Sequence, residues 1–346
     1  MDVSSEPLRH GWIAGLAIAA LAGILCAIVI VLLRPLMVRY ALARPNARSS
    51  HTIPTPQGGG MAIVASTLLM AGSVLAHGGR MSPSEAAAIA AVFGATLLIA
   101  ILGAIDDIRP IEVIPRLLVQ AVAVGIVIAA LPAQFQMTPL LPWWLERVML
   151  VFAGLWFVNL VNFMDGLDWM TVAEMVPVTA ALALFGMLGA LPEAGVVVAL
   201  ALLGALVGFA PFNRPVARLF LGDVGSLPIG LLIGWLLALL ANKGHLAAAL
   251  LLPLYFLLDA SVTLLRRLAR GERLWQAHRS HFYQLATDNG FSVPQIIARV
   301  FAVNIVLAVL AYICIRFNTH AVEIAALVAG LIVVSSLLLR FSMKRS

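Results

Sequence analysis

The sequence predicts an all-α protein that crosses a membrane many times. Of its 346 residues, 62% are hydrophobic and only 11% are charged, and the mean hydropathy is +1.03. A soluble domain carries roughly 25% charged residues, so this composition excludes that class. Cys26 and Cys314 each lie inside an apolar run, which indicates small core residues rather than a disulfide framework. We expect a single membrane-embedded domain over residues 1–346.

Apolar stretches long enough to span a bilayer recur along the whole chain. A transmembrane helix needs about 20 mostly apolar residues, and windows of that length predict about eleven spans. The first window follows Asp2 and Glu6 rather than a basic segment, which favours a retained helix over a cleaved signal peptide. Turn residues such as Asn242-Lys243-Gly244 separate the windows. The windows are roughly 11–33, 59–76, 85–105, 113–131, 143–162, 171–190, 193–211, 226–241, 246–265, 295–315 and 321–340.

The distribution of Lys and Arg predicts the orientation of these spans. With the N-terminus outside, 17 of the 22 basic residues fall on the cytoplasmic side, as the positive-inside rule requires. An odd number of spans then places the C-terminus in the cytoplasm. The net charge of +6 is therefore a topology signal, and it gives no support to nucleic-acid binding.

Carboxylates gather at the ends of three separate spans on the predicted cytoplasmic side. Asp106 and Asp107 follow the third span, Asp165 and Asp168 follow the fifth, and Asp223 precedes the eighth. Ionisable groups at the membrane edge are costly and indicate a functional site. The plain alternative is that Asn, Asp and Gly form ordinary turns there. The predicted outer loops are short and chemically poor, so we expect the inner face to carry the function.

Two of these acidic segments suit a phosphate-bearing ligand and a divalent cation. Adjacent carboxylates such as Asp106 and Asp107 repel by roughly 4 kcal/mol at 4 Å and an effective dielectric of 20. They therefore indicate either a metal-facing or general-base pair, or a solvated helix end beside Arg109. The turn Gly222-Asp223-Val-Gly225-Ser226 could offer backbone N–H groups to a phosphate and a carboxylate to a cation. A plain tight loop is the alternative.

Two cytoplasmic segments add cationic and hydrogen-bonding groups. The longest predicted loop, residues 266–294, contains five arginines with His278 and His281. A zinc site would need further Cys or His ligands nearby, so a wall around a phosphorylated substrate fits better. In the earlier segment before Gly58-Gly59-Gly60, Arg48 and His51 could contact anionic groups, although no P-loop pattern is present. Asp259, inside the ninth window, needs a polar partner or a protonated state.

Together these motifs resemble the polyprenyl-phosphate N-acetylhexosamine-1-phosphate transferases, the family of MraY, WecA and WbpL. The resemblance spans nearly the whole chain. His278 and His281 lie in an Ala-His-Arg-Ser-His-Phe-Tyr loop that looks closer to WbpL-type enzymes than to MraY. Trp169 is a departure, because many relatives carry glycine at that position. The motifs that carry the resemblance are Asp106-Asp107, Asn162-Phe-Met-Asp165-Gly-Leu-Asp168 and Phe220-Leu-Gly222-Asp223-Val-Gly225-Ser226.

The resemblance implies transfer of a sugar 1-phosphate from a UDP-N-acetylhexosamine to undecaprenyl phosphate, with release of UMP, at the start of O-antigen or related glycan synthesis. It implies Mg²⁺, or Mn²⁺ in its place, bound by Asp223. Asp106 or Asp107 would position or deprotonate the lipid phosphate. The bacterial cytoplasmic membrane is the implied location, with a homodimer as the expected assembly. Substrate contacts are implied for Arg48, His51, Asn162, Asp165, Gly166, Leu167, Asp168, Asn213, Phe220, His278, Arg279 and His281.

Two other classes of protein compete with this interpretation. A lipid-linked sugar transporter would place its polar residues near the bilayer midplane on broken helices, whereas here they gather at one surface. A membrane scaffold would not need five cytoplasmic aspartates in this pattern. The sequence leaves the donor open among N-acetylglucosamine, N-acetylfucosamine and N-acetylquinovosamine, and the segment from His278 to Tyr283 would read that difference.

Overall fold

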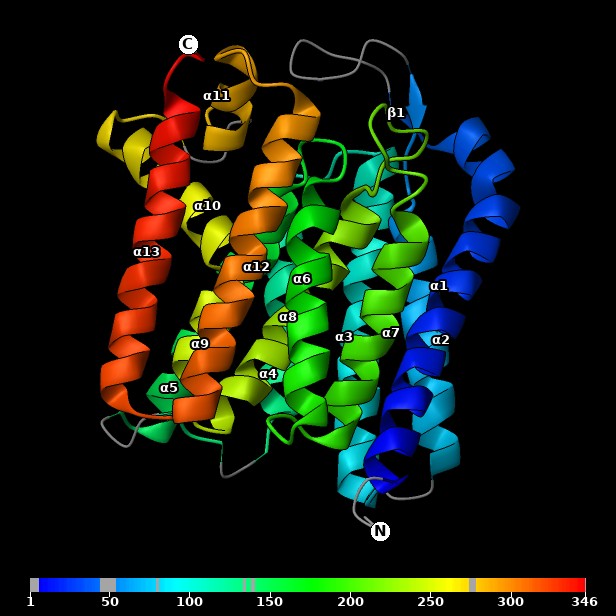
Figure 1. Ribbon diagram of the computed structural model, residues 1–346. Coiled ribbons are helices and arrows are strands. Elements are labelled where there is room, and N and C mark those ends of the chain that lie inside the picture. The colour runs from blue at the N-terminus through cyan, green and yellow to red at the C-terminus, as the bar shows by residue number, and fades with distance from the viewer. Residues whose placement is uncertain are drawn as a thin grey trace.

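A computed structural model shows a bundle of helices, with the two termini at opposite ends (Figure 1). It describes residues 6–43, 54–78, 81–132, 135–137, 141–273 and 278–345. Eight of the described helices are long and apolar enough to cross a membrane, and α4 and α7 are shorter apolar helices. The predicted all-α membrane fold is confirmed. The count of eleven spans and the side on which each end lies stay predictions.

Each predicted window contains helix. The helices are α1 (Glu6–Tyr40), α2 (Gly60–Gly78), α3 (Pro83–Ile108), α4 (Val113–Ala129), α5 (Trp143–Met164), α6 (Met170–Met187), α7 (Glu193–Phe209), α8 (Asp223–Asn242), α9 (Leu246–Leu251), α10 (Leu254–Ala269), α11 (Phe282–Asp288), α12 (Val293–Phe317) and α13 (His320–Ser342). One antiparallel pair of short strands, β1 (Leu42–Ala43) and β2 (Thr55–Pro56), accompanies them.

The ninth window and the segment after it differ from the prediction in detail. The window holds two helices, α9 and α10, which are separated at Leu252 and Pro253. Proline has no N–H to donate to a preceding turn and clashes with it, so a continuous helix ends there. The predicted loop 266–294 also contains the last turn of α10 and all of α11. Periodicity could not reveal α11, because it has only seven residues.

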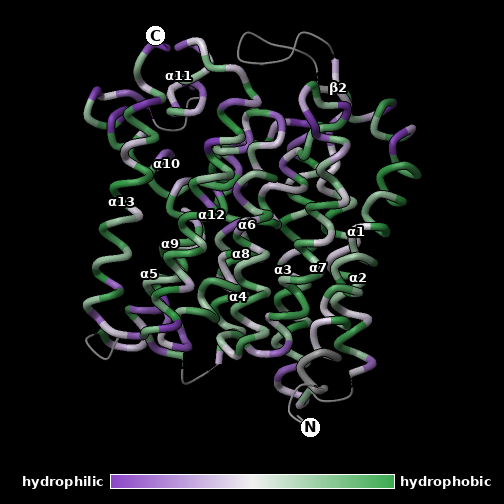
Figure 2. Tube along the Cα trace, viewed as in Figure 1, coloured by the Kyte–Doolittle hydropathy of each residue, from purple (hydrophilic) through white to green (hydrophobic). Residues whose placement is uncertain are grey.

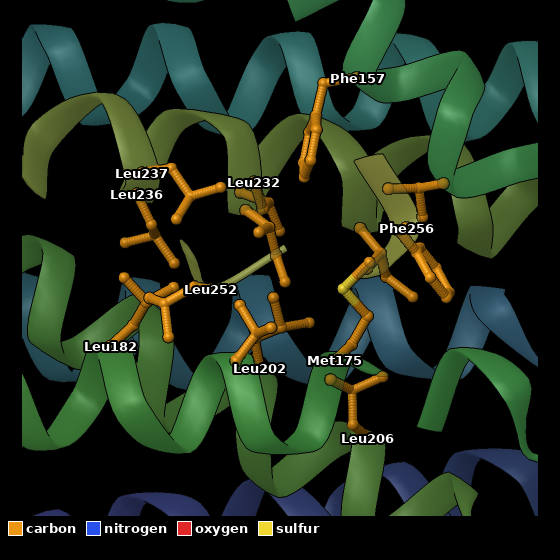
Figure 3. Packing of buried hydrophobic residues seen from close by; sticks show 14 of the residues in the cluster. Phe157, Met175, Leu182, Leu202, Leu206, Leu232, Leu236, Leu237, Leu252 and Phe256 are labelled. Atoms are coloured by element: carbon orange, nitrogen blue, oxygen red, sulfur yellow. The ribbon is translucent and has the colours of Figure 1, made fainter. Parts of the chain in front are cut away.

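Helix α8 is the centre of the bundle and α1 is at its periphery. In the most apolar window of α8, 89% of the residues are buried, whereas in the corresponding window of α1 only 17% are buried. A helix that is apolar all round is expected inside a bundle, whereas one exposed to lipid keeps its large side chains outside. Leu232, Leu236 and Leu237 of α8 lie in the packed interior with side chains of α5, α6 and α7 (Figure 3). Figure 2 shows hydrophobic residues along the middle of the bundle and hydrophilic residues towards both ends.

Small residues let α1 and α7 cross at close range. A Cβ at Gly204 or Gly208 of α7 would collide with backbone atoms of Ala19 or Gly23 in α1. In a membrane, where lipid is as apolar as leucine, such close backbone packing is a main source of helix association. This contact attaches α1 to the bundle.

Candidate active site

Three glycines bring the ends of α2, α3 and α8 together. A Cβ on Gly60, at the start of α2, would overlap Gly225 in the first turn of α8. A Cβ on Gly103, in the last turns of α3, would overlap backbone atoms of Asp223. The absence of side chains at these positions therefore places the Asp106-Asp107 pair directly against the first residue of α8. The glycine at the start of α2 thus allows a close approach of two backbones.

The segment before α2 pairs with the segment before α8. The N–H of Phe220 donates to Pro56 O (2.8 Å), and Gly59 N donates back to Phe220 O (2.9 Å). Gly60 N donates to Leu221 O (2.9 Å). The side-chain amide of Gln57 also donates to the carbonyl of Asp107 (2.7 Å). These bonds fix the Gly222-Asp223 turn against the end of α3.

Asp107 holds the N-terminus of α8. Its two carboxylate oxygens accept hydrogen bonds from the backbone N–H groups of Asp223 (2.9 Å) and Val224 (3.1 Å). The first N–H groups of a helix have no partner within the helix, and a carboxylate is a favourable acceptor for them. Asp107 thus positions Asp223, and its own oxygens are already engaged.

Asp106, Arg116 and Asp223 form a charged cluster beside this helix end. The Arg116 guanidinium lies 2.9 Å from Asp106 and 3.8 Å from Asp223. Ile111 N donates to the other oxygen of Asp106 (2.6 Å). Asn162, from the last turn of α5, donates its side-chain amide to Asp223 (2.7 Å) and to the Ser226 hydroxyl (2.9 Å). Four separate elements therefore converge on one carboxylate.

This cluster opens into a cavity of about 710 Å³ that is lined by both polar and apolar side chains. The polar ones include Arg116, Asn162 and Asp223 together with residues at and before α11. The apolar ones belong to α4, α5 and α10. The lining residues are Val113, Arg116, Leu117, Phe152, Leu155, Trp156, Asn159, Asn162, Phe163, Asp223, Leu264, His278, His281 and Gln284.

His278 and His281 face the same cavity with stacked rings. Their centroids are 4.9 Å apart, and the ring planes differ by 30°. Burial lowers the pKa of His278 to about 4, and the nearby His281 and Arg267 act in the same direction. His278 is therefore neutral near pH 7, and its Nδ1 lies 2.8 Å from the Ser280 hydroxyl.

The Asp165–Trp169 turn lies next to the cavity and is anchored to the segment before α8. Ala217 N donates to the Asp168 carboxylate (3.0 Å). Trp169 N donates to the side-chain oxygen of Asn213 (2.8 Å), and Asn213 donates to Leu219 O (3.0 Å). Trp169 has φ = 64°, a conformation that glycine adopts at no steric cost. Trp169 thus adopts a backbone conformation that suits glycine, the residue that the family resemblance leads one to expect at this position.

Asp165 is a buried acid in this turn, and its pKa is clearly shifted. Burial raises its pKa to about 7, with contributions from the charges of Asp107 and Asp168. The hydroxyl of Thr171 donates to it (2.5 Å) and opposes that shift. Near neutral pH the carboxyl group is close to half protonated.

The structure brings only part of the predicted set into the cavity lining. Asn162, Asp223, His278 and His281 line it, and Asp106 contacts the lining through Arg116. Arg48 and His51 lie outside the described residues. Arg279 reaches Asp288 (3.6 Å) and the Thr287 hydroxyl (3.3 Å) on α11 instead. The remaining predicted residues are not among the lining residues: Asp107, Asp165, Gly166, Leu167, Asp168, Asn213 and Phe220.

Sequence reasoning assigned no site role to two polar residues, Arg116 and Gln284. Arg116 bridges two of the predicted carboxylates. Gln284 lines the cavity, as does Asn159. An arginine inside an apolar helix is costly unless it is paired, and Arg116 lies within α4, so that placement was a usable signal.

The residues present fit a divalent cation that is completed by a substrate. Among the described residues, no three His, Cys, Asp or Glu side chains gather as a ready-made metal site. Mg²⁺, however, is commonly held by one or two carboxylates plus phosphate oxygens. Asp106 and Asp223 lie within hydrogen-bonding reach of each other, an arrangement that calls for a shared proton or a cation. Asp223 and Asp106 are therefore the residues that would hold such an ion.

Fold and site together define a polytopic membrane protein with a charged, phosphate-compatible cavity at one end of its helical bundle. Residues 89–241 match the model of glycosyl transferase family 4, and this range contains the three acidic motifs. The chain is also 29% identical over 221 residues to the decaprenyl-phosphate N-acetylglucosaminephosphotransferase of Mycolicibacterium smegmatis. That match covers 58% of this chain and about half (54%) of the relative. The resemblance to polyprenyl-phosphate N-acetylhexosamine-1-phosphate transferases is confirmed, and the WbpL-like subtype stays a prediction.

Proposed function

We propose that this protein transfers a sugar 1-phosphate from a UDP-N-acetylhexosamine to undecaprenyl phosphate and releases UMP. The cavity is the observation that carries the proposal. Its polar lining residues suit phosphate groups, and its apolar lining residues, among them Phe152, Trp156 and Leu264, suit the chain of a lipid. The similarity to a decaprenyl-phosphate N-acetylglucosaminephosphotransferase supports the same substrate classes.

The reaction joins the lipid phosphate to the phosphorus that carries the sugar. An oxygen of undecaprenyl phosphate attacks that phosphorus, the bond to UMP breaks, and UMP leaves with the electron pair. Phosphoryl transfer asks the protein chiefly for positioning and for neutralisation of charge. Arg116 and Asn162 lie at the cavity where they can orient phosphate oxygens. A Mg²⁺ or Mn²⁺ ion bound by Asp223 and Asp106 would neutralise charge on the diphosphate.

Asp106 and Asp107 both act on the cavity through another side chain. Both oxygens of Asp107 accept backbone N–H groups of α8, so that carboxylate acts through Asp223. The oxygens of Asp106 accept from Ile111 N and from the Arg116 side chain that lines the cavity. Asp106 would therefore position the lipid phosphate through Arg116 and through the cation that it would share with Asp223.

The wider biological proposal follows from the substrates. An undecaprenyl diphosphate-linked sugar is the starting unit of O-antigen and related envelope glycans, which places the protein in the bacterial cytoplasmic membrane. The cavity would then face the cytoplasm, where nucleotide sugars are available. We propose a homodimer as the assembly, on the basis of family resemblance.

Purified protein tests the proposal directly. Undecaprenyl phosphate, Mg²⁺ and one donor at a time, UDP-N-acetylglucosamine or its 6-deoxy relatives, are supplied in detergent and UMP is measured. The proposal predicts UMP release that requires both the lipid and one donor of the panel. A lipid-linked sugar transporter, the alternative, would release no UMP with any donor.

A further inference from the structure

Asp259 is a fully buried carboxylate on α10 that the reaction described above does not use. It is 0% exposed, and its oxygens accept hydrogen bonds from Phe282 N (3.0 Å) and Tyr283 N (3.2 Å) at the start of α11. A carboxylate buried at this depth is costly unless donors surround it. Asp259 therefore joins a membrane helix to the short helix that covers the cavity.

The same carboxylate contacts a ring that lines the cavity. His281 Nδ1 lies 3.2 Å from Asp259 Oδ1, and His281 is 2% exposed. Both oxygens of Asp259 already act as acceptors for backbone N–H groups, one from Phe282 and one from Tyr283. This geometry assigns the hydrogen between Asp259 and His281 to Nδ1. Nε2 is left as an acceptor, because the partner of one ring nitrogen sets the tautomer of the other.

Neighbouring contacts keep this ring and its helix in place. The His281 ring stacks on Tyr283 at 5.7 Å with planes only 18° apart, and on His278 on the cavity side. The Tyr283 hydroxyl donates to Phe163 O (3.1 Å), next to Asn162. A Cβ at Gly166 would overlap that hydroxyl, so the α5 end and α11 are in close contact. Asp259 contacts both the His281 ring and the backbone N–H groups at the start of α11, so it supports both.

We propose that Asp259 is a positioning residue that holds His281 in the Nδ1-protonated tautomer and presents Nε2 to the sugar. In this role Nε2 accepts a hydrogen bond from a hydroxyl group or from the acetamido N–H of the hexosamine. This role rests on the proposed function, because it assigns His281 to the sugar rather than to a phosphate oxygen. Oriented carboxylate–histidine pairs of this kind fix ring geometry at other protein sites.

The tautomer can be measured without any turnover. Protein labelled with ¹⁵N-histidine is studied by NMR, and the His281 signals are assigned by their loss in His281→Gln. The proposal predicts a protonated Nδ1 and a bare Nε2 in the wild type, and loss of that preference in Asp259→Ala and Asp259→Asn. A wild-type Nε2–H tautomer, or a tautomer unchanged in both variants, overturns it. If Asp259→Ala does not fold, Asp259→Asn and the wild-type tautomer decide.

Kinetics in two backgrounds separate positioning from a purely structural role. Asp259→Asn should lower kcat/KM by about tenfold or more, mainly by raising the KM for the UDP-sugar, and should change it by less than about threefold in a His281→Ala background. Equal losses in both backgrounds would contradict action through His281. Tyr255→Phe and Thr263→Val are matched controls, because they remove only the two longest contacts to Asp259 (3.4 Å each).

The two measurements also distinguish failure of this inference from failure of the proposed function. A wild type that releases no UMP with any donor, yet shows the Asp259-dependent tautomer, refutes the transferase and retains the positioning of His281. A wild type that turns over, with a tautomer independent of Asp259, refutes the inference alone.

Discussion

At the scale of single residues, the acidic groups divide into those that face the cavity and those that hold others in place. Asp223 lines the cavity, whereas Asp107 and Asp168 accept backbone N–H groups from neighbouring segments. Their sequence context is similar, since all follow or precede apolar runs. Only the convergence of α3, α5 and α8 decides which carboxylate faces the cavity.

Replacing Asp107 tests its structural role. In Asp107→Asn the amide can accept only one of the two N–H groups of α8, so the free energy of unfolding should fall by about 1 kcal/mol. Because Asp223 would then be held less firmly, UMP release should fall but remain measurable. Thermal unfolding in detergent and the UMP assay check both effects. Unchanged stability together with complete loss of activity would instead assign Asp107 to the chemistry.

The raised pKa of Asp165 predicts a dependence of stability on pH. Its pKa is about 7 in the folded protein and about 4 when solvated, so the stabilisation of the folded state by the bound proton is full below pH 4. That contribution is lost as pH rises through 7. Asp165→Asn removes the titration, so the melting temperature of the variant relative to wild type should be higher at pH 8 than at pH 5. An equal difference at both pH values would contradict the assigned burial.

At the scale of elements, glycines determine which helices meet at the site and how the peripheral helix α1 is attached to the bundle. Gly60 and Gly103 bring α2 and α3 against α8, and Gly204 and Gly208 bring α7 against α1. Their conformation is helical, so what matters is the space that a side chain would fill. The sequence signals such positions only weakly, since Gly94 and Gly125 look alike in sequence and meet open space.

A matched pair of substitutions tests this contact of α1 with α7. Gly204→Ala would place a methyl group on the backbone of Ala19 and should destabilise the protein by roughly 1–3 kcal/mol, as overpacking does. Gly94→Ala, in α3, meets nothing within 4 Å and should be neutral or slightly stabilising. Melting temperatures in detergent compare the two. Equal effects would show that α1 and α7 do not cross as described.

The elements also show how far sequence reasoning reaches. Long apolar windows predicted helices at every described span, because hydrocarbon thickness fixes their length. The break before Pro253, the seven-residue α11 and the strand pair at Leu42 and Thr55 depend on local or long-range pairing that has no apolar period. The acidic motifs could be found because each is contiguous in the sequence. The bridge from Arg116 to Asp106 and Asp223 could not, because it joins three separate helices.

At the scale of the whole molecule, the polar lining residues Asn162, Asp223 and His281 come from the ends of α5, α8 and α11 at the end of the bundle that carries the C-terminus (Figure 1). A transporter would be expected to gather its substrate groups near the midplane instead. The cavity is lined both by apolar side chains of α4 and α5 and by charged groups such as Arg116 and Asp223, a combination that suits a lipid with a phosphate head.

The orientation of the bundle can be tested at the two ends of one region. Arg214 precedes α8 on the side of the site, and Lys243 follows α8 at the opposite end. In a background with Cys26→Ala and Cys314→Ala, we expect Arg214→Cys to react with a membrane-impermeant maleimide only in inverted vesicles. Lys243→Cys should react only in intact spheroplasts. The reverse pattern would place the site outside the cell and contradict the use of cytoplasmic nucleotide sugars.

The mass of the lipid product tests the central claim most directly. Purified protein is incubated with undecaprenyl phosphate, Mg²⁺ and the donor panel, and the masses of the lipid products are measured by mass spectrometry. The account predicts an undecaprenyl diphosphate bearing one N-acetylhexosamine from wild type, and at least about a hundredfold less from folded Asp223→Asn. Unmodified lipid phosphate with every donor, or near-normal product from Asp223→Asn, would contradict it.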